Sequence, residues 1–136
     1  MDKYVVIVLY RDGNKGEPKE FLDIREGVSC INNYRKCDNK KYKYVALLNK
    51  ATSIVVRILC FSEGKLINEI YDGDVVRLRE RYCEPGEAKN LYTVTDINEN
   101  TGRCLIISLN SGMAIAPSET VGLEMIETVS HIAPLK

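Results

Sequence analysis

Three arginines alternate with other residues in one short segment, and their type and spacing carry the clearest chemistry in this sequence. Arg77, Arg79 and Arg81 lie within residues 75–82, where charged and apolar residues alternate. Because side chains two residues apart share one face of a β-strand, we expect the three guanidinium groups to project from the same face. Arginine binds phosphate groups through parallel N–H bonds, so the segment predicts a phosphate-recognition surface.

Further residues would complete such a surface. Arg57 could hold another phosphate, and a base could stack on a platform formed by aromatic rings and one more guanidinium group. The candidates for that platform are Tyr82, Tyr92 and Arg103. The alternative is that acids of the same chain neutralise the arginines, because exposed ion pairs are common in proteins. The candidate acids are Glu80, Glu84, Glu87 and a residue on a neighbouring strand.

A second basic and aromatic segment covers residues 34–44. Its spacing predicts Lys41 and Lys43 on one face of a strand, with Tyr42 and Tyr44 on the other. Basic residues interleaved with aromatic ones suit the backbone and the bases of a nucleic acid. The alternative, which we favour, is an edge strand whose lysines prevent aggregation.

The sequence offers little for catalysis or for metal binding. Its single histidine, His131, lies in a C-terminal tail that we expect to be loose, whereas a nucleophile needs a base within hydrogen-bond reach. The five cysteines lack the two close pairs of a structural zinc site. They are Cys30, Cys37, Cys60, Cys83 and Cys104. We therefore expect a protein that is not an enzyme and that has no metal or cofactor.

Composition indicates one globular domain of 136 residues, with 45% hydrophobic and 28% charged residues. The net charge is zero, yet residues 1–61 carry 12 basic and 7 acidic residues (+5), and residues 62–136 carry 7 and 12 (−5). This distribution argues against a uniformly basic nucleic-acid binder. It would suit head-to-tail or symmetric docking of identical copies, so we expect a homo-oligomer.

The length of the N-terminal apolar segment and the number of cysteines indicate the subcellular location. Residues 4–10 form an apolar stretch too short to span a bilayer, and no signal-peptide cleavage site follows it. An odd number of cysteines without close pairing indicates reduced thiols. We therefore expect a cytoplasmic protein that does not bind a membrane.

Strand-like segments recur along the chain between turns that contain glycine, which predicts a mainly β fold. They cover residues 5–9, 42–48, 54–61, 66–71, 75–82, 91–97, 103–109, 113–116 and 123–129. Residues 20–31 predict one short helix, which Gly27 interrupts. The regular spacing favours a small antiparallel barrel or sandwich. A mixed α+β domain is the alternative if residues 20–40 or 117–127 are helical.

The C-terminal half also resembles a known type of domain. The segments GDVVRL at 73–78, PG at 85–86, YTV at 92–94, NSG at 110–112 and VGLEMI at 121–126 resemble small SH3-like barrels. In particular they are similar to an uncharacterised family of short domains in phage and mobile-element genomes. Leu109 stands where that family usually has an aromatic residue, and Ser111 is inserted in its Asn-Gly turn. Over residues 72–128 the resemblance implies a barrel and a viral or mobile-element origin.

Together these observations predict a binding protein of phage or mobile-element origin rather than an enzyme. Its ligand would carry phosphate, as a nucleotide or a nucleic acid. It would act as a counter-defence factor that sequesters a nucleotide signal or blocks a host protein. The alternative is a protein–protein interaction or structural module without a small-molecule ligand.

Overall fold

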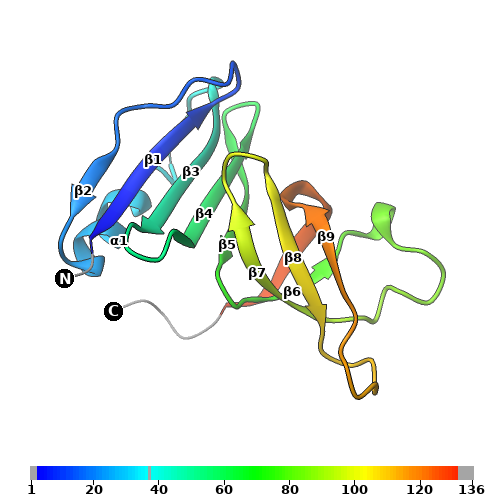
Figure 1. The fold of residues 1–136 in the computed structure, drawn as a ribbon. Coiled ribbons are helices and arrows are strands. Elements are labelled where there is room, and N and C mark those ends of the chain that lie inside the picture. Colours follow the sequence, from blue (N-terminus) through cyan, green and yellow to red (C-terminus); the bar gives the residue numbers. More distant parts are fainter. Residues whose placement is uncertain (1–2, 37, 132–136) are drawn as a thin grey trace.

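The computed structural model describes residues 3–36 and 38–131, which form two five-stranded antiparallel sheets and one α-helix (Figure 1). The first sheet has the order β2-β1-β3-β4-β5. Its strands are β1 (Tyr4–Tyr10), β2 (Lys19–Phe21), β3 (Tyr42–Asn49), β4 (Ile54–Ser62) and β5 (Lys65–Tyr71). The second sheet has the order β10-β6-β7-β8-β9. Its strands are β6 (Val75–Leu78), β7 (Tyr92–Asn98), β8 (Arg103–Ser108), β9 (Ser118–Gly122) and β10 (Ile126–Ser130).

The central strands of the first sheet are buried on both faces, whereas the edge strands β2 and β5 carry exposed residues. On one face, Val45 and Leu59 pack beneath the helix α1 (Ile24–Asn32). On the other face, Ala46 and Ile58 pack against the second sheet. The prediction of a mainly β protein with one short helix is confirmed.

Gly27 lies within α1 rather than ending it. The side chain of Asp23 caps the helix by accepting a hydrogen bond from the backbone N–H of Arg25 at 2.8 Å. A Cβ atom at Gly27 would lie only 2.8 Å from Cδ1 of the fully buried Leu47. The glycine therefore allows the helix to approach the sheet closely, and this approach outweighs its low helix propensity.

The second sheet carries the C-terminal half of the chain. The strands β6, β7, β8 and β9 are consecutive in the chain and neighbours in the sheet. A 3-10 helix, η2 (Leu123–Met125), then leads into β10, which pairs with the free edge of β6. The predicted barrel is not closed. Among the described residues its strands form a five-stranded sheet whose edge strands, β9 and β10, are not paired with each other.

Several details of the strand predictions were wrong. The strand β2 was not predicted, and residues 123–125 of the strand predicted over 123–129 form η2. The strand predicted over residues 75–82 ends at Leu78 and is followed by a second 3-10 helix, η1 (Glu80–Tyr82). Residues 113–116 form no strand, and the polar segment that becomes β9 was not predicted. Residues 117–127 are not α-helical. Within the part of the chain that the structure describes, no helix is long and apolar enough to cross a membrane.

The basic and aromatic segment before and within β3 also differs from its prediction. β3 pairs with both β1 and β4, so it is not an edge strand. A register shift between Leu9 and Tyr10 of β1 places Tyr42 against the helix-side core and Tyr44 against the core between the sheets. The ring of Tyr42 packs against three other aromatic rings instead of being presented for base stacking. Those rings are Tyr10, Tyr34 and Phe61.

Candidate functional site

The first arginine of the predicted surface is positioned by β6. Val76 and Leu78 are buried, so Arg77 between them is exposed on the opposite face, as the alternation predicts. β6 pairs with β7 only at Val75 and Val76, and its pairing with β10 ends at Leu78. Among the described residues, no partner strand continues the ladder beyond Leu78, and the chain turns there.

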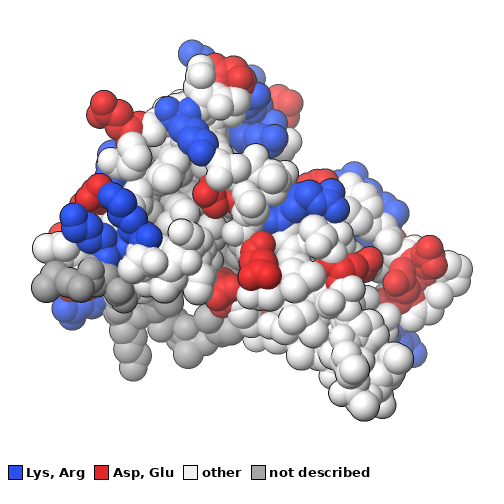
Figure 2. Space-filling view, in the orientation of Figure 1, with Lys and Arg blue, Asp and Glu red and all other residues white. Residues whose placement is uncertain are grey.

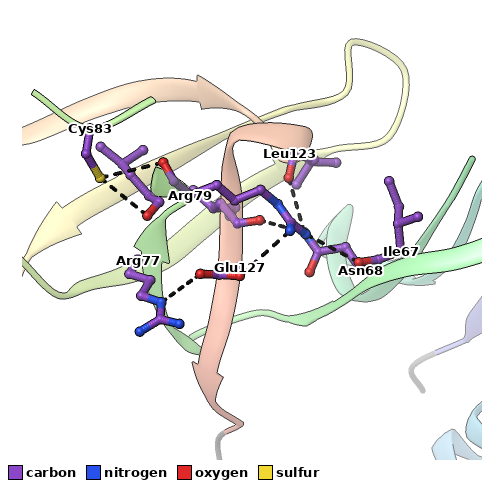
Figure 3. Close-up of polar contacts among 9 residues, drawn as sticks. Ile67, Asn68, Arg77, Arg79, Cys83, Leu123 and Glu127 are labelled. Atoms are coloured by element: carbon purple, nitrogen blue, oxygen red, sulfur yellow. Dashed lines mark hydrogen bonds and ion pairs between the residues drawn. The ribbon is translucent and has the colours of Figure 1, made fainter. Parts of the chain in front are cut away.

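Arg79 lies just after the strand. Its backbone N–H donates to the carbonyl of Met125 at 2.8 Å, and its own carbonyl accepts from Tyr82 N–H at 2.8 Å. The thiol of Cys83 lies 3.5 Å from the Leu78 carbonyl oxygen and 3.6 Å from that of Arg79 (Figure 3). The prediction that three arginines share one face of one strand was therefore wrong, because only Arg77 belongs to the strand.

A single carboxylate nevertheless brings two of the arginines together. Glu127 stands directly opposite Arg77 in the antiparallel register of β10 and β6. Its Oε1 lies 2.7 Å from Nε of Arg77, and its Oε2 lies 3.7 Å from Nη1 of Arg79 (Figure 3). Of the acids predicted to neutralise the arginines, the one on a neighbouring strand is Glu127, and it pairs with Arg77 and Arg79.

Arg79 and the neighbouring Asn68 also join the two sheets. Nη2 of Arg79 donates to the carbonyl of Ile67 on β5 at 3.3 Å. The next residue, Asn68, is buried, and its side-chain amide donates to the carbonyls of Leu123 at 3.2 Å and Ile126 at 2.8 Å. These bonds satisfy a buried polar group and fix the start of β10, which carries Glu127.

Arg81 occupies the outer side of the cluster. It is exposed, and its guanidinium carbon lies 5.0 Å from the centre of the Tyr82 ring, within cation–π range. A cavity of about 610 Å³ is lined by Arg79, Glu80, Arg81 and Glu127. A neighbouring cavity of about 270 Å³ includes Arg77, Glu80 and Glu127 in its lining. Three guanidinium groups and two carboxylates therefore surround these two spaces. We call these five residues the arginine cluster.

The other predicted ligand residues lie elsewhere. Arg57 is only 4% exposed on β4, where it donates to Oδ1 of Asn32 at 2.8 Å and packs 4.1 Å from the Tyr71 ring centre. Tyr92 is buried on β7 and lines a different cavity, near β9. Arg103 donates to the carbonyl of Thr120 on the edge strand β9 at 3.2 Å. The structure brings none of these three residues to the arginine cluster.

His131 is held in place, contrary to the prediction of a loose tail at this residue. Its Nδ1 lies 2.7 Å from Oδ2 of the fully buried Asp74, and its ring stacks on Tyr71 with centres 4.1 Å apart. The same tyrosine ring packs against Arg57. The His131 ring therefore links the end of β10 to β5, and the Tyr71 ring between them also covers part of Arg57 on β4. The rest of the predicted tail, residues 132–136, lies outside the described residues.

The cysteines provide no site of their own. Burial raises the pKa of the Cys60 thiol, and burial raises the pKa of the Cys104 thiol to about 12. Both belong to the core between the sheets. Cys37 lies outside the described residues. Among the described residues, no three or more His, Cys, Asp or Glu side chains are grouped to hold a metal ion.

The sequence did not indicate that Glu127 and Asn68 contribute to this site. Glu127 follows Arg77 by 50 residues, and only the pairing of β6 with β10 makes them neighbours. An acid on a neighbouring strand was expected, but the sequence held no signal for which one. No protein-family model, no curated protein and no solved structure matches this chain.

Proposed function

We propose that this protein binds a phosphate-bearing ligand, a nucleotide or a nucleic acid, at the arginine cluster and does not catalyse a reaction on it. The observation that carries this proposal is the carboxylate of Glu127, which Arg77 and Arg79 hold between them. A carboxylate and a phosphate present similar pairs of acceptor oxygens to guanidinium groups. The arrangement that holds one anion of the chain itself is therefore suited to holding an external one.

The cluster has donors in addition to those that Glu127 uses. Within the described residues, Arg77 contacts Glu127 through Nε alone, and Arg81 contacts only the Tyr82 ring. The terminal amino groups of Arg77 and the guanidinium donors of Arg81 are thus available to phosphate oxygens. With three guanidinium groups against the carboxylates of Glu80 and Glu127, the cluster has an excess charge of +1, which favours an anionic ligand.

The larger of the two spaces is an open, shallow depression of about 610 Å³ lined by four charged residues. A ligand would therefore lie on this surface through its charged groups rather than be enclosed in a pocket. Tyr82 is the one predicted stacking residue beside the cluster, where a base could lie against its ring. Binding of this kind would allow the protein to sequester a nucleotide signal. A phage or mobile-element origin and a counter-defence role extend the proposal and rest on the sequence resemblance alone.

Isothermal titration against mono-, di- and cyclic nucleotides and inorganic pyrophosphate tests this function. The wild-type protein is expected to bind at least one member of the panel, and Arg77→Ala and Arg81→Ala are expected to weaken that binding by about tenfold or more. Arg103→Ala is the matched control, since it removes an exposed arginine outside the cluster and should leave the affinity unchanged. No binding across the panel, or an equal loss in the control, would rule the function out.

A second candidate function, protein–protein interaction, is favoured by a separate observation. The connection between β8 and β9, residues 109–117, contains no charged residue and exposes three large apolar side chains. Apolar side chains gathered on one projecting loop are typical of contact surfaces. This candidate does not depend on the arginine cluster.

A further inference from the structure

The connection between β8 and β9 forms an uncharged projection from the molecule. Its three large apolar side chains are far more exposed than a fold-stabilising role would require: Leu109 is 53% exposed, Met113 65% and Ile115 85%. Figure 2 shows this projection as a white lobe at the lower right, where Figure 1 places the β8–β9 loop. Exposure of this extent costs solvation free energy, which contact with a partner would recover.

Acidic side chains lie at the base of this loop. A cavity of about 330 Å³ lies there, and its walls include Glu87 and Glu119 together with Ser111 and Pro117 of the loop. Among the described residues, no lysine or arginine lines this cavity, and Lys89 contacts the base of the loop through its backbone carbonyl, which accepts from Asn110 Nδ2 at 3.3 Å. A partner that receives the loop should therefore combine an apolar recess with basic side chains around it.

The first sheet of the same chain offers such a recess. A cavity of about 220 Å³ is lined by four apolar or aromatic residues at the ends of β3 and β4 and on β5. They are Tyr44, Cys60, Phe61 and Ile67. Cys60 and Phe61 are each only 3% exposed, so Tyr44 and Ile67 supply the accessible apolar surface. Arg11 and Lys43 add two positive charges to the lining, and Glu124 adds one negative charge, which leaves an excess of +1. Nη2 of Arg11 donates to the Phe61 carbonyl at 2.7 Å, which holds this arginine at the cavity.

The two surfaces lie at opposite ends of the molecule. The β4–β5 turn and the start of β3 are at the top of Figure 1, whereas the β8–β9 loop is at the bottom. The charge distribution of the chain has the same polarity, with an excess of five basic residues in residues 1–61 and five acidic residues in residues 62–136. Copies joined through these two surfaces would therefore associate head to tail.

We propose that the protein self-associates in this way, with the β8–β9 loop of one copy docked in the Arg11–Lys43 cavity of the next. Ile115 and Met113 of the loop contact the apolar lining, and Glu119 beside the loop faces Lys43. Since each copy uses two different surfaces, the contact is heterologous and leaves one loop and one cavity open at the ends of the assembly. Such an assembly grows beyond a dimer unless it closes into a ring.

Sedimentation equilibrium over a wide range of protein concentrations tests the contact. The average mass is expected to rise with concentration and to exceed that of a dimer. Ile115→Asp should weaken association by at least about tenfold, because it buries a charge in the contact. Leu22→Asp is the matched control, since Leu22 is 60% exposed on a different part of the surface and its variant should associate normally. A monomer at all concentrations, a mass that stops at the dimer, or equal effects of the two variants would overturn the proposal.

A charge exchange identifies the two surfaces. Lys43→Glu and Glu119→Lys each place like charges across the contact, so each variant alone should remain monomeric at concentrations where the wild type associates. Mixed in equal amounts, the two variants restore opposite charges at both kinds of contact and should assemble together. Both positions are exposed, so folding is preserved, and circular dichroism checks this. Failure of the mixture to assemble, or association of either variant alone, would overturn the pairing.

Discussion

Arg77 and Glu127 stand directly opposite each other on β6 and β10, with Nε of the arginine 2.7 Å from Oε1 of the glutamate. This cross-strand pair connects two segments of the chain separated by 50 residues. Because Glu127 also contacts Arg79, it acts as the internal counter-ion of the arginine cluster. An external phosphate would have to compete with this carboxylate for the same donors.

Glu127→Gln should therefore strengthen phosphate binding. The variant removes the competing negative charge, and we expect its affinity for pyrophosphate to rise by roughly threefold to tenfold, in line with the roughly 1 kcal/mol upper range of a solvent-exposed ion pair. Titration calorimetry of the variant and the wild type measures the change. A weaker affinity in the variant would mean that Glu127 serves the ligand rather than competing with it.

Asn68→Ala should destabilise the protein. The variant loses two buried hydrogen bonds to the carbonyls of Leu123 and Ile126, at a cost of about 1–3 kcal/mol in the free energy of unfolding. Urea unfolding measures this free energy. Asn100→Ala is the control, because Asn100 is exposed and should change stability by less than about 0.5 kcal/mol. Equal stabilities of the two variants would show that the Asn68 bonds do not hold the sheets together.

Asp72→Asn should stabilise the protein at neutral pH. Burial raises the pKa of Asp72, and a hydrogen bond from Thr95 only partly offsets this shift. A carboxyl group whose pKa is higher in the folded state stabilises that state when protonated, and this contribution is lost as the pH rises through the folded-state pKa. The variant lacks the charge, so its gain in stability should be present at pH 7 and decline toward pH 3.

Urea unfolding at the two pH values measures this dependence. Glu17→Gln, a change at an exposed carboxylate, is the control and should alter neither value. A lower stability of Asp72→Asn at pH 7 would contradict the assignment of a half-buried carboxylate whose charge destabilises the folded state.

Thiol reactivity should separate the cysteines by burial. Cys60 and Cys104 are 3% and 1% exposed, and their raised pKa values keep both as thiols at pH 8. Iodoacetamide should therefore modify them only when the protein opens, much more slowly than the half-buried Cys83. Mass spectrometry of the digested protein over time gives the three rates. Labelling of Cys104 as fast as Cys83 would contradict the burial of Cys104 in the core between the sheets.

Most strands could be predicted from the sequence because their side chains follow a local pattern. β1, β3, β4, β7 and β8 are rich in β-branched and apolar residues and are bounded by turn-forming ones. β9 could not be found this way, since Ser118, Glu119 and Thr120 are polar and exposed on an edge strand. The end of β6 at Leu78 could not be predicted from the sequence either, because it depends on where the pairing with β7 and β10 ends.

The candidate site was predictable only in its residue types. The alternating arginines marked the region, yet the charge opposite Arg77 comes from a strand far along the chain. Arg57 looked like its neighbours in sequence, but the helix and the Tyr71 ring bury it. His131 looked like a tail residue because its stacking on Tyr71 and its contact with Asp74 are tertiary. Such contacts leave no periodic pattern in the sequence.

Phosphate binding at the arginine cluster can be tested most directly by NMR observation of the arginine side chains. In a titration with pyrophosphate, the Nε–Hε signals of Arg77, Arg79 and Arg81 should shift together and saturate, while those of Arg25 and Arg103 stay unchanged. This result would place the phosphate beside Glu127, where the three guanidinium groups surround the two cavities. Absent shifts, or shifts of equal size at all five arginines, would contradict the proposed site.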